Sequence, residues 1–516
     1  MSISPLSSTQ HSTTTEPPLS RLLEQSTIIC LFLFAIFAPH SIAGTQAAWL
    51  LGLFFWVLRF ALYRRPQFKR TPVDLALLVF FALTLISTVF SYEPGISVGK
   101  LRAASLFTIV YLVAQNISSR RIIRLLVLLL IASSFAGSLF TIGERAVGRG
   151  VKVQTLRTES PLYTAGVRPG DTLLEINDEK LRDPDHLLQE LKTPDPHPVQ
   201  VKVYRHELVL VYSVPRGKLL HGNSAVAQLG IGSWSSGRDW RASGLFSHYV
   251  TYAESLQLVL ALAIGLFVAL PKKLNLAGTF LLLAIAGMGY ALILTVTRAP
   301  WAGAVVSTGL IVLFGTRKRV FLLVSLLAIP LVLAGVFMLQ ARRNIGFIDP
   351  KDHSTTWRQT VWREGYQLLL SNPRHLLVGI GMDSIKGRWR QWGMFDGGKI
   401  PIGHMHSNLL QLALERGVPA LLVWLVLLGL YARVLLLLIR RLKKEAADAA
   451  PEGVWIERGL VLGALGGLAG FFVSGIVHYN WGDSEVVMIF YFLMGLTLTL
   501  NTLVRNNPNS PAVRHR

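Results

Sequence analysis

Long apolar runs, separated by short polar segments, occupy most of the sequence. A helix needs about 20 apolar residues to cross the hydrocarbon core of a bilayer, and about twelve runs approach that length. The predicted spans are residues 26–43, 46–62, 73–90, 101–117, 122–142, 249–270, 274–296, 300–315, 319–339, 418–439, 457–477 and 485–504. The pattern predicts an all-α polytopic membrane protein, with five spans in residues 22–145 and the others in residues 219–504.

Lysines and arginines give these spans an orientation, because short cytoplasmic loops are enriched in them. Basic clusters follow every second span: Arg64 and Arg65, Arg120 and Arg121, Lys272 and Lys273, Arg317 to Arg319, Arg440 and Arg441, and Arg505. We therefore expect both termini in the cytoplasm, with a disordered tail at residues 1–21 and a second tail at 505–516. The large polar segments 143–248 and 340–417 are then expected outside.

Composition agrees with a membrane protein. Of the 516 residues, 51% are hydrophobic and 16% are charged, against about a quarter charged in soluble domains. The net charge of +22 could indicate nucleic acid, but much of the basic excess lies in short clusters between spans, so no nucleic-acid partner is expected. Cys30 is the single cysteine, which excludes an internal disulfide and a cysteine-based metal site.

An inserted segment, residues 151–215, has a different pattern. Valines alternate with polar residues near its two ends, which predicts half-buried strands, and residues 184–192 read as a helix. The segment resembles a PDZ domain of the bacterial envelope-protease type. The matching residues are Ser160-Pro161, Ala165-Gly166, Pro169-Gly170-Asp171 and Ile176-Asn177. We place this domain at residues 146–218.

The PDZ resemblance implies capture of an extended peptide by strand addition, so a peptide or an envelope protein is a possible partner. The stretch expected to bind the peptide carboxylate, residues 143–150 (GERAVGRG), lacks the usual apolar residues. A docking or spacer module packed on the membrane domain is the alternative.

The outer segment 340–405 combines many basic residues with the tryptophans Trp357, Trp362, Trp389 and Trp392. Guanidinium groups bind phosphate through paired hydrogen bonds, and tryptophan offers flat apolar faces. The combination indicates an anionic, partly apolar ligand such as a lipid-linked diphosphate sugar. Anchoring to interfacial membrane lipids is the alternative.

Three arginines are candidates for binding such a ligand. Helical spacing over residues 356–370 places Arg358 and Trp362 on one face, and Asn372-Pro373 ends that helix. Arg298 and Arg241 lie at the outer mouths of two spans. They face either the ligand or the lipid headgroups, toward which arginines at span ends extend.

Residues 403–417, GHMHSNLLQLALERG, place His404 and His406 at the mouth of the following span. Polar groups beside hydrocarbon are costly, so their presence there indicates function. Either histidine would face an outer cavity.

The same segment predicts a short helix. Asn408 and Gln411 have the spacing of an N-cap and its partner, so a helix over residues 409–416 would end at Gly417, and Pro419 would begin the next helix. If the helix begins earlier, His404, Asn408, Gln411 and Glu415 form one polar stripe.

Together these motifs resemble the O-antigen ligase/polymerase superfamily of bacterial envelopes. The resemblance is carried by His406 to Gln411 with Glu415-Arg416-Gly417, by Arg358 to Gly365 followed by Asn372-Pro373 and Gly379-Ile380-Gly381, by Thr297-Arg298, and by Arg241, Gly244 and Phe246. It implies a GT-C-like glycosyltransferase of the bacterial inner membrane that needs neither a metal nor another cofactor. Such an enzyme would move a glycan from undecaprenyl diphosphate to lipid A–core, or another envelope acceptor, at a periplasmic active site.

The resemblance and the polar pattern give each candidate residue a role. Arg241, Arg298 and Arg358 would stabilise the charge of the leaving diphosphate. His406 would act as a general base or orient the diphosphate. The expected substrate-binding residues are His404, Asn408, Gln411, Glu415 and Trp362.

Two other functions remain open. A polymerase of polysaccharide repeat units would share these motifs and use another repeat unit as its acceptor. A transporter of lipid-linked glycan would perform no chemistry, but transporters commonly place ionisable residues near the bilayer midplane, and the predicted spans carry few there.

Overall fold

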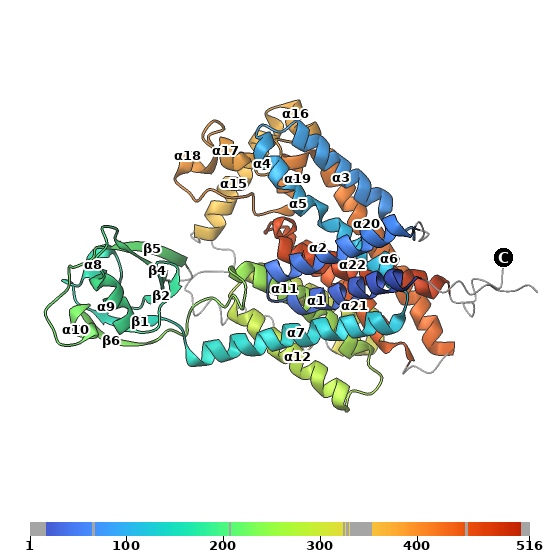
Figure 1. The fold of residues 1–516 in the computed structure, drawn as a ribbon, viewed down its shortest axis with the longest axis horizontal. Coiled ribbons are helices and arrows are strands. Elements are labelled where there is room, and N and C mark those ends of the chain that lie inside the picture. The colour runs from blue at the N-terminus through green and yellow to red at the C-terminus, as the bar shows by residue number, and fades with distance from the viewer. Residues whose placement is uncertain are drawn as a thin grey trace, which may run out of the picture.

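The computed structural model is a helical bundle with a small β-sheet module at one end (Figure 1). It describes residues 17–63, 68–205, 208–323, 326, 330, 353–448 and 453–506. Among these residues, nine helices are long and apolar enough to cross a bilayer. They are α1 (Pro18–Phe37), α2 (Ile42–Leu62), α7 (Arg120–Val147), α11 (Tyr249–Ala269), α12 (Leu276–Leu294), α13 (Arg298–Gly315), α20 (Val418–Asp448), α21 (Trp455–Gly475) and α22 (Ser484–Arg505). The predicted fold class is confirmed.

Residues 101–117 correct the prediction, because they do not form one continuous span. The run is divided into α5 (Leu101–Ala104), the 3₁₀ turn η1 (Ser105–Phe107) and α6 (Thr108–Asn116). The Ser105 and Thr108 hydroxyls each donate a hydrogen bond of 2.8 Å to the carbonyl three residues earlier. Such local side-chain bonds compete with regular helix hydrogen bonding.

The remaining differences concern length and coverage. α3 (Asp74–Val89) is apolar but shorter than the nine spans. Most of the predicted span 319–339 lies outside the described residues, as do most of the two predicted tails.

Glycines let the central helices α11, α13 and α21 approach closely. A Cβ on Gly265 of α11 would lie 2.4 Å from the carbonyl oxygen of Gly459 in α21, and one on Gly303 of α13 would lie 2.8 Å from that of Gly470. Ser307 of α13 donates a hydrogen bond of 2.7 Å to the Gly466 carbonyl. Close packing of small residues stabilises helix association in membranes, and here it holds α11 and α13 against α21.

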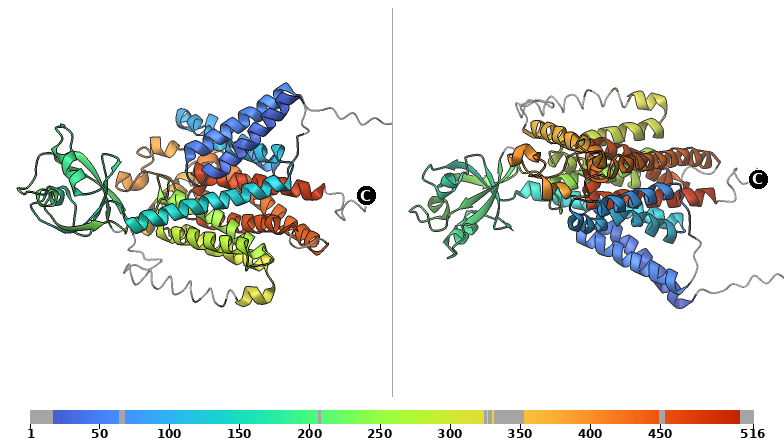
Figure 2. Two further views of the ribbon diagram at one scale, coloured as in Figure 1. Left: turned by 60° about the horizontal axis from the view of Figure 1, so that its bottom comes forward. Right: turned by 90° about the horizontal axis from the view of Figure 1, so that it is seen from above.

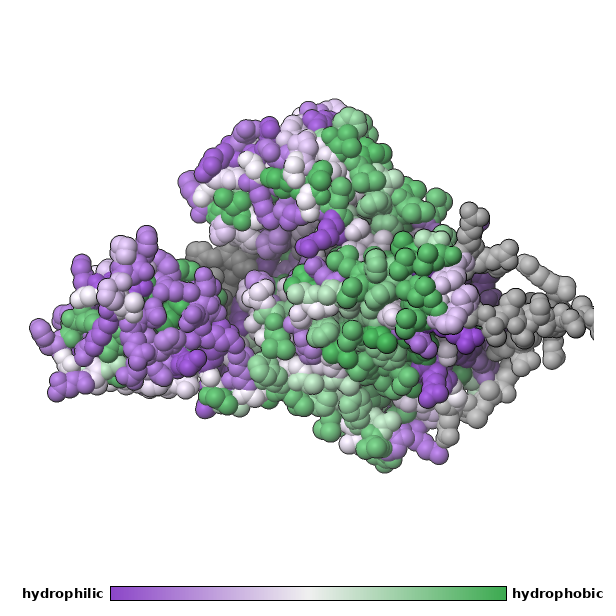
Figure 3. All heavy atoms as spheres, in the orientation of Figure 1, coloured by the Kyte–Doolittle hydropathy of each residue, from purple (hydrophilic) through white to green (hydrophobic). Residues whose placement is uncertain are grey.

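Two further views show the bundle helices running broadly along the long axis, with the module at one end (Figure 2). Hydrophobic residues cover much of the visible bundle side, whereas the module surface is mainly hydrophilic (Figure 3). The module therefore lies beyond the apolar belt.

The module is an antiparallel sheet with the order β5-β4-β2-β1-β6, with β3 paired to β2. Its elements are β1 (Val151–Leu156), α8 (Pro161–Ala165), β2 (Thr172–Ile176), β3 (Glu179–Lys180), α9 (Pro184–Lys192), β4 (Val199–Arg205), β5 (Leu208–Val214), α10 (Ala225–Gln228) and β6 (Ile231–Ser236). The predicted helix at 184–192 and the predicted strands are present. The sheet also extends past residue 218, because β6 returns to cover the edge of β1, and an uncovered edge strand invites unwanted pairing.

The module is docked on the helical bundle through a small apolar cluster. Leu174 and Tyr204 of the sheet pack with Trp240 and Ala242 of the following linker and with Leu294 at the end of α12. The Ala242 amide donates a hydrogen bond of 3.0 Å to the Leu294 carbonyl. The module is therefore packed on the membrane domain, as the docking alternative expects, and these contacts leave peptide capture open.

Between α13 and α20 the described chain forms one helix of 18 residues and several shorter helices beside the bundle. They are α15 (His353–Leu370), α16 (Pro373–Val378), α17 (Ser384–Arg388), α18 (Met394–Gly398) and α19 (Asn408–Arg416); α4 (Pro94–Gly99) lies earlier in the chain. The predicted helix ending before Asn372-Pro373 is present, and Asn372 caps α16.

Candidate active site

A cavity of about 2080 Å³ lies at the module end of the bundle. The starts of α11, α13 and α22 line it, together with α15, the loop before α19 and the loop between α21 and α22. The module contributes a further wall through the turn at 168–171 and through Arg205. Segments far apart in sequence therefore share one chamber.

The three predicted arginines all line this cavity. Arg241 precedes α11, Arg298 begins α13, and Arg358 lies in the second turn of α15. The guanidinium carbon of Arg241 lies 4.5 Å from the centroid of the Tyr249 ring, a cation–π contact that orients it. Three separate parts of the chain thus bring positive charge to this cavity.

His404 and His406 stand side by side at the cavity wall. Their ring centroids are 4.0 Å apart, and the His406 ring lies 4.3 Å from that of Trp357. The backbone of His406 is left-handed, with φ of +46°, a conformation that costs energy for a non-glycine residue and often marks a functional position.

Both imidazoles are neutral near pH 7. Burial lowers the pKa of His404 to about 4, with the Lys386 charge as a smaller cause. Burial also holds the pKa of His406 well below its ordinary value, and His404, His478 and Arg358 lower it further. A neutral imidazole can both donate and accept a hydrogen bond.

The start of α19 corrects the predicted cap. Ser407, with extended backbone angles, accepts the hydrogen bond from the Leu410 amide, so Ser407 is the N-cap and Asn408 is the first helical residue. The helix ends at Gly417, whose φ of +83° and close approach to the Leu377 carbonyl suit only glycine. Pro419 lies in the first turn of α20, as predicted. Since α19 begins at Asn408, His404 does not belong to a helical stripe.

Asn408 and Gln411 are buried and do not line the cavity. Asn408 donates a hydrogen bond of 2.6 Å to Asn480 and accepts one of 3.0 Å from the Trp481 amide. Gln411 accepts one of 2.6 Å from the Met405 amide. Neither side chain therefore reaches the cavity lining, and their predicted role in substrate binding stays a prediction.

Glu415 and Trp362 do line the cavity. Glu415 accepts hydrogen bonds from Gln411, from the Asp383 amide and from the Tyr479 hydroxyl, at 2.8, 2.8 and 3.1 Å. The indole of Trp362 donates a hydrogen bond of 2.7 Å to the Met405 carbonyl. Trp362 therefore holds the loop of residues 403–407 (the histidine loop), whereas Glu415 ties α19 to Asp383 and Tyr479.

Arg416 lines the cavity, although the sequence motif that contains it predicted no role for it. It is 7% exposed, and its Nε and Nη1 atoms have no hydrogen-bond partner among the described residues. Its third nitrogen lies 3.4 Å from the Met382 sulfur, and its guanidinium carbon lies 5.4 Å from the Phe80 ring centroid. By contrast, Arg205 at the same cavity pairs with Asp171 at 2.6 Å. A buried cation without a carboxylate is costly, so this position is suited to an anionic ligand.

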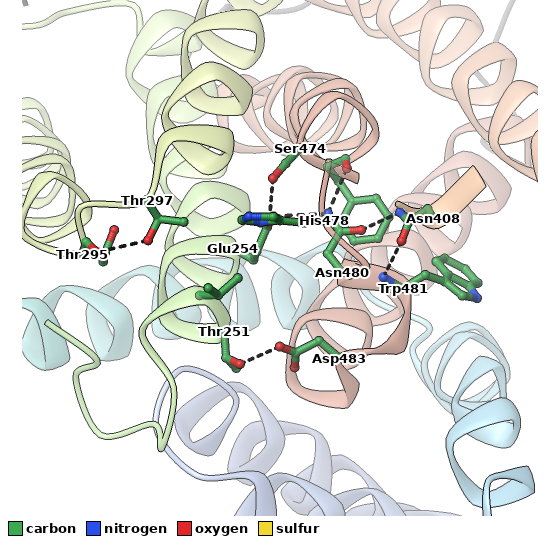
Figure 4. A network of polar contacts seen from close by, with 12 residues as sticks. Thr251, Glu254, Thr295, Thr297, Asn408, Ser474, His478, Asn480, Trp481 and Asp483 are labelled. Carbon is green, nitrogen blue, oxygen red and sulfur yellow. Dashed lines mark hydrogen bonds and ion pairs between the residues drawn. The ribbon is translucent and has the colours of Figure 1, made fainter. Parts of the chain in front are cut away.

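A second overlooked group surrounds Glu254 in α11 (Figure 4). Its carboxylate, on a residue 1% exposed, accepts hydrogen bonds from Ser474, from His478 at 3.1 Å and from Asn480 at 3.2 Å. Glu254 and His478 both line the cavity. In the sequence, Glu254 was marked only as a glutamate inside an apolar run, and His478 only as a histidine just after a different apolar run.

Within the described residues, no group of three or more histidine, cysteine, aspartate or glutamate residues is arranged to hold a metal ion.

The fold and the cavity define a multi-pass membrane protein with a docked sheet module and a basic chamber beside it. Residues 281–425 match the family model of the O-antigen ligase, and residues 152–205 match that of the PDZ domain. The chain thus carries the two domains whose resemblance its motifs indicated, and the first supports a ligase- or polymerase-like glycosyltransferase. No curated protein matches the chain. Arg241, Glu254 and His478 lie outside both matched segments.

Proposed function

We propose that the protein is a glycosyltransferase that moves a glycan from undecaprenyl diphosphate to an envelope acceptor. The observation that carries this proposal is the uncompensated, buried Arg416 in a cavity that Arg241, Arg298 and Arg358 also line. Arginine binds phosphate through charge-assisted, often paired hydrogen bonds, and a partly apolar chamber beside membrane helices suits a lipid-linked diphosphate.

In the proposed reaction, negative charge develops on the leaving diphosphate, beside these arginines. An acceptor hydroxyl oxygen bonds to the anomeric carbon of the donor sugar as the bond from that carbon to the diphosphate oxygen breaks. The bonding electron pair leaves with undecaprenyl diphosphate. Arg241, Arg298 and Arg358 stabilise the developing negative charge, an effect that is larger where water is excluded.

Of the two roles expected for His406, general base and orienting the diphosphate, its surroundings fit the second. Its neighbours within ring contact are His404 and Trp357, and the Arg358 charge opposes its protonation. A neutral imidazole in that setting can donate a hydrogen bond to a diphosphate oxygen and thereby orient the donor.

The proposed orientation places the cavity in the periplasm of a bacterial inner membrane. At the bundle end away from the module, Arg120 pairs with Glu445 at 2.7 Å and Arg124 with Glu457 at 2.6 Å. Clusters of basic residues favour the cytoplasmic side. With that end inside, the cavity and the module face outward.

Lipid A–core is the proposed acceptor, as for a ligase, and a repeat-unit polymerase is the alternative. The docked module forms one wall of the cavity, and in this proposal that wall faces the acceptor. Peptide or envelope-protein capture at its strand edge is a separate prediction.

Reconstitution tests the function. Purified protein in vesicles would receive undecaprenyl-diphosphate-linked glycan and either lipid A–core or a second lipid-linked repeat unit. We expect a lipid A–core band carrying the glycan on a gel. Chain growth on the carrier lipid instead would identify a polymerase, and movement of the donor across the bilayer without any transfer would identify a transporter.

A further inference from the structure

We propose that Glu254 and His478 form the proton-accepting pair of this cavity. Nε2 of His478 removes the proton from the acceptor hydroxyl, and Glu254 positions and stabilises the imidazole. The inference rests on the glycosyl transfer proposed above and adds the residue that activates the acceptor.

The geometry of the pair fixes the imidazole. Nδ1 of His478 lies 3.1 Å from a Glu254 carboxylate oxygen, so the proton of the neutral ring resides on Nδ1 and the lone pair on Nε2. The one side-chain hydrogen bond of His478 to a described residue is made by Nδ1, which leaves Nε2 available, and the residue lines the cavity. A histidine oriented by a buried carboxylate in this way is the arrangement by which hydroxyl groups are activated on several unrelated folds.

The surroundings of Glu254 keep its carboxylate in place. Ser474 near the end of α21 and Asn480 in the following 3₁₀ turn η3 (Asn480–Gly482) both donate to it. Asn480 in turn donates to the Phe471 carbonyl at 3.0 Å and accepts from Asn408. The carboxylate is thus held by α21, by η3 and, through Asn480, by α19 (Figure 4).

The pair is better suited than His406 to receive a proton. A base becomes a cation when it acts, and the Glu254 charge stabilises the His478 cation. His406 has no ion pair with an acid within the described ranges; it faces His404 at 4.0 Å and the Arg358 charge. The two histidines therefore have different roles: His406 orients the diphosphate, and His478 accepts the proton of the acceptor hydroxyl.

Other titratable groups face His478 and enter any pH profile. His248 at the start of α11 and His404 and His406 before α19 interact with it electrostatically. Asp483 before α22 accepts a hydrogen bond from Thr251, and burial together with Glu485 raises its pKa. A profile must therefore be compared between variants and not read from the wild type alone.

The proton balance of the step is complete. The acceptor O–H bond breaks as the new bond to the anomeric carbon forms, and the proton moves to Nε2 of His478. The diphosphate leaves with the electron pair of the broken glycosidic bond. His478 then releases its proton to water in the cavity or to the departing diphosphate, which restores the neutral ring.

The test uses the full-length protein in vesicles with the lipid-linked donor and lipid A–core. Single-turnover transfer rates and donor affinity would be measured from pH 5 to pH 9 for His478→Gln, Glu254→Gln and wild type. His375→Gln is the matched control, because His375 is also buried and hydrogen-bonded, to Tyr92 and to the Leu368 carbonyl, but lies outside the cavity.

We expect His478→Gln to lower the transfer rate by about 10²- to 10⁴-fold, with donor affinity unchanged. Added imidazole should partly restore transfer in His478→Ala. Glu254→Gln should move the rise of the rate with pH to lower pH, because loss of the negative charge makes protonation of His478 less favourable. A purely structural role would not move that rise.

Three results would overturn the pair. The first is wild-type transfer rates in His478→Gln. The second is a lower melting temperature in both His478→Gln and Glu254→Gln, with the pH dependence of the transfer rate unshifted in the protein that remains folded. The third is loss of the pH-dependent rise in His406→Gln but not in His478→Gln. Absence of transfer by the wild-type protein, with donor still bound, would instead overturn the proposed function and the pair with it.

Discussion

The side-chain amide of Asn408, the first residue of α19, donates a hydrogen bond of 2.6 Å to the side chain of Asn480 in the turn between α21 and α22. The two residues are 72 positions apart. Asn408 lies two residues after His406 and Asn480 two residues after His478, so this bond links the two cavity loops. It gives the buried asparagine a function that does not require contact with substrate.

Replacement of Asn408 by alanine should separate the two loops. It leaves the Trp481 backbone amide and the side-chain oxygen Oδ1 of Asn480 without their partners, which costs about 1–3 kcal/mol for each buried group. We expect a lower melting temperature and a slower transfer rate with little change in donor affinity. Asn116→Ala is the control, since the buried Asn116 side chain bonds, among the described residues, only to the Leu112 carbonyl, four residues earlier. An Asn408→Ala protein with wild-type stability would contradict this role.

Replacement of Arg416 by methionine should separate ligand binding from stability. The guanidinium has no carboxylate partner among the described residues, so its removal should leave the melting temperature of the ligand-free protein unchanged or raised. Donor affinity should fall roughly 10- to 100-fold, because charge-assisted hydrogen bonds contribute about 1.5–3 kcal/mol. Calorimetric titration measures this loss. Arg440→Met, at the far end of α20, is the control, and a destabilised Arg416→Met protein that binds donor normally would show a structural role.

Arg298→Lys should impair transfer although it keeps the positive charge. Lysine lacks the planar fork that contacts two phosphate oxygens, so we expect a reduction of roughly ten-fold or more in the single-turnover rate. Arg317→Lys, just beyond the other end of α13 and outside the cavity, should change nothing. Full activity of Arg298→Lys would reduce Arg298 to a membrane anchor.

His404 should make stability depend on pH in the acid range. Its pKa is about 4 in the folded protein against 6.5 for an ordinary histidine. Between these values the unfolded chain binds the additional proton, so stability should fall as the pH drops from about 6.5 toward 4, by at most about 1.4 kcal/mol per pH unit. His404→Gln should show a shallower decline in melting temperature over that window and the same stability above it. An identical slope in both proteins would contradict the assignment.

Excision of the module should leave the membrane domain inserted. Val151 and Ser236 are paired across β1 and β6, so a short glycine–serine linker can join the chain there without strain. We expect normal membrane insertion and donor affinity within a few-fold of wild type, because Arg241, Arg298 and Arg358 remain. Transfer to the acceptor should slow, since one cavity wall is lost. Failure to insert would show that the module is part of the core fold.

The sequence by itself determined those features that depend on neighbouring residues. Apolar length predicted most spans, alternation predicted the strands of the module, and the predicted helix at 184–192 has the observed bounds. Local chemistry also marked the histidine loop and the stop at Gly417. The cap was misassigned by one residue, because Ser407 and Asn408 are both good cap formers and only the backbone angles distinguish them.

Only the tertiary structure decided which polar residues meet. Glu254 and His478 are 224 positions apart, and no spacing rule connects them. Arg416 belongs to a sequence motif, but only its burial without a carboxylate among the described residues distinguishes it from the paired Arg205. The sequence predicted that Asn408 and Gln411 bind substrate, but in the fold their side chains bond to buried backbone and side-chain groups. Proximity across a membrane bundle depends on helix packing through residues such as Gly265 and Gly303, and that packing, unlike helix formation, is a property of the whole chain.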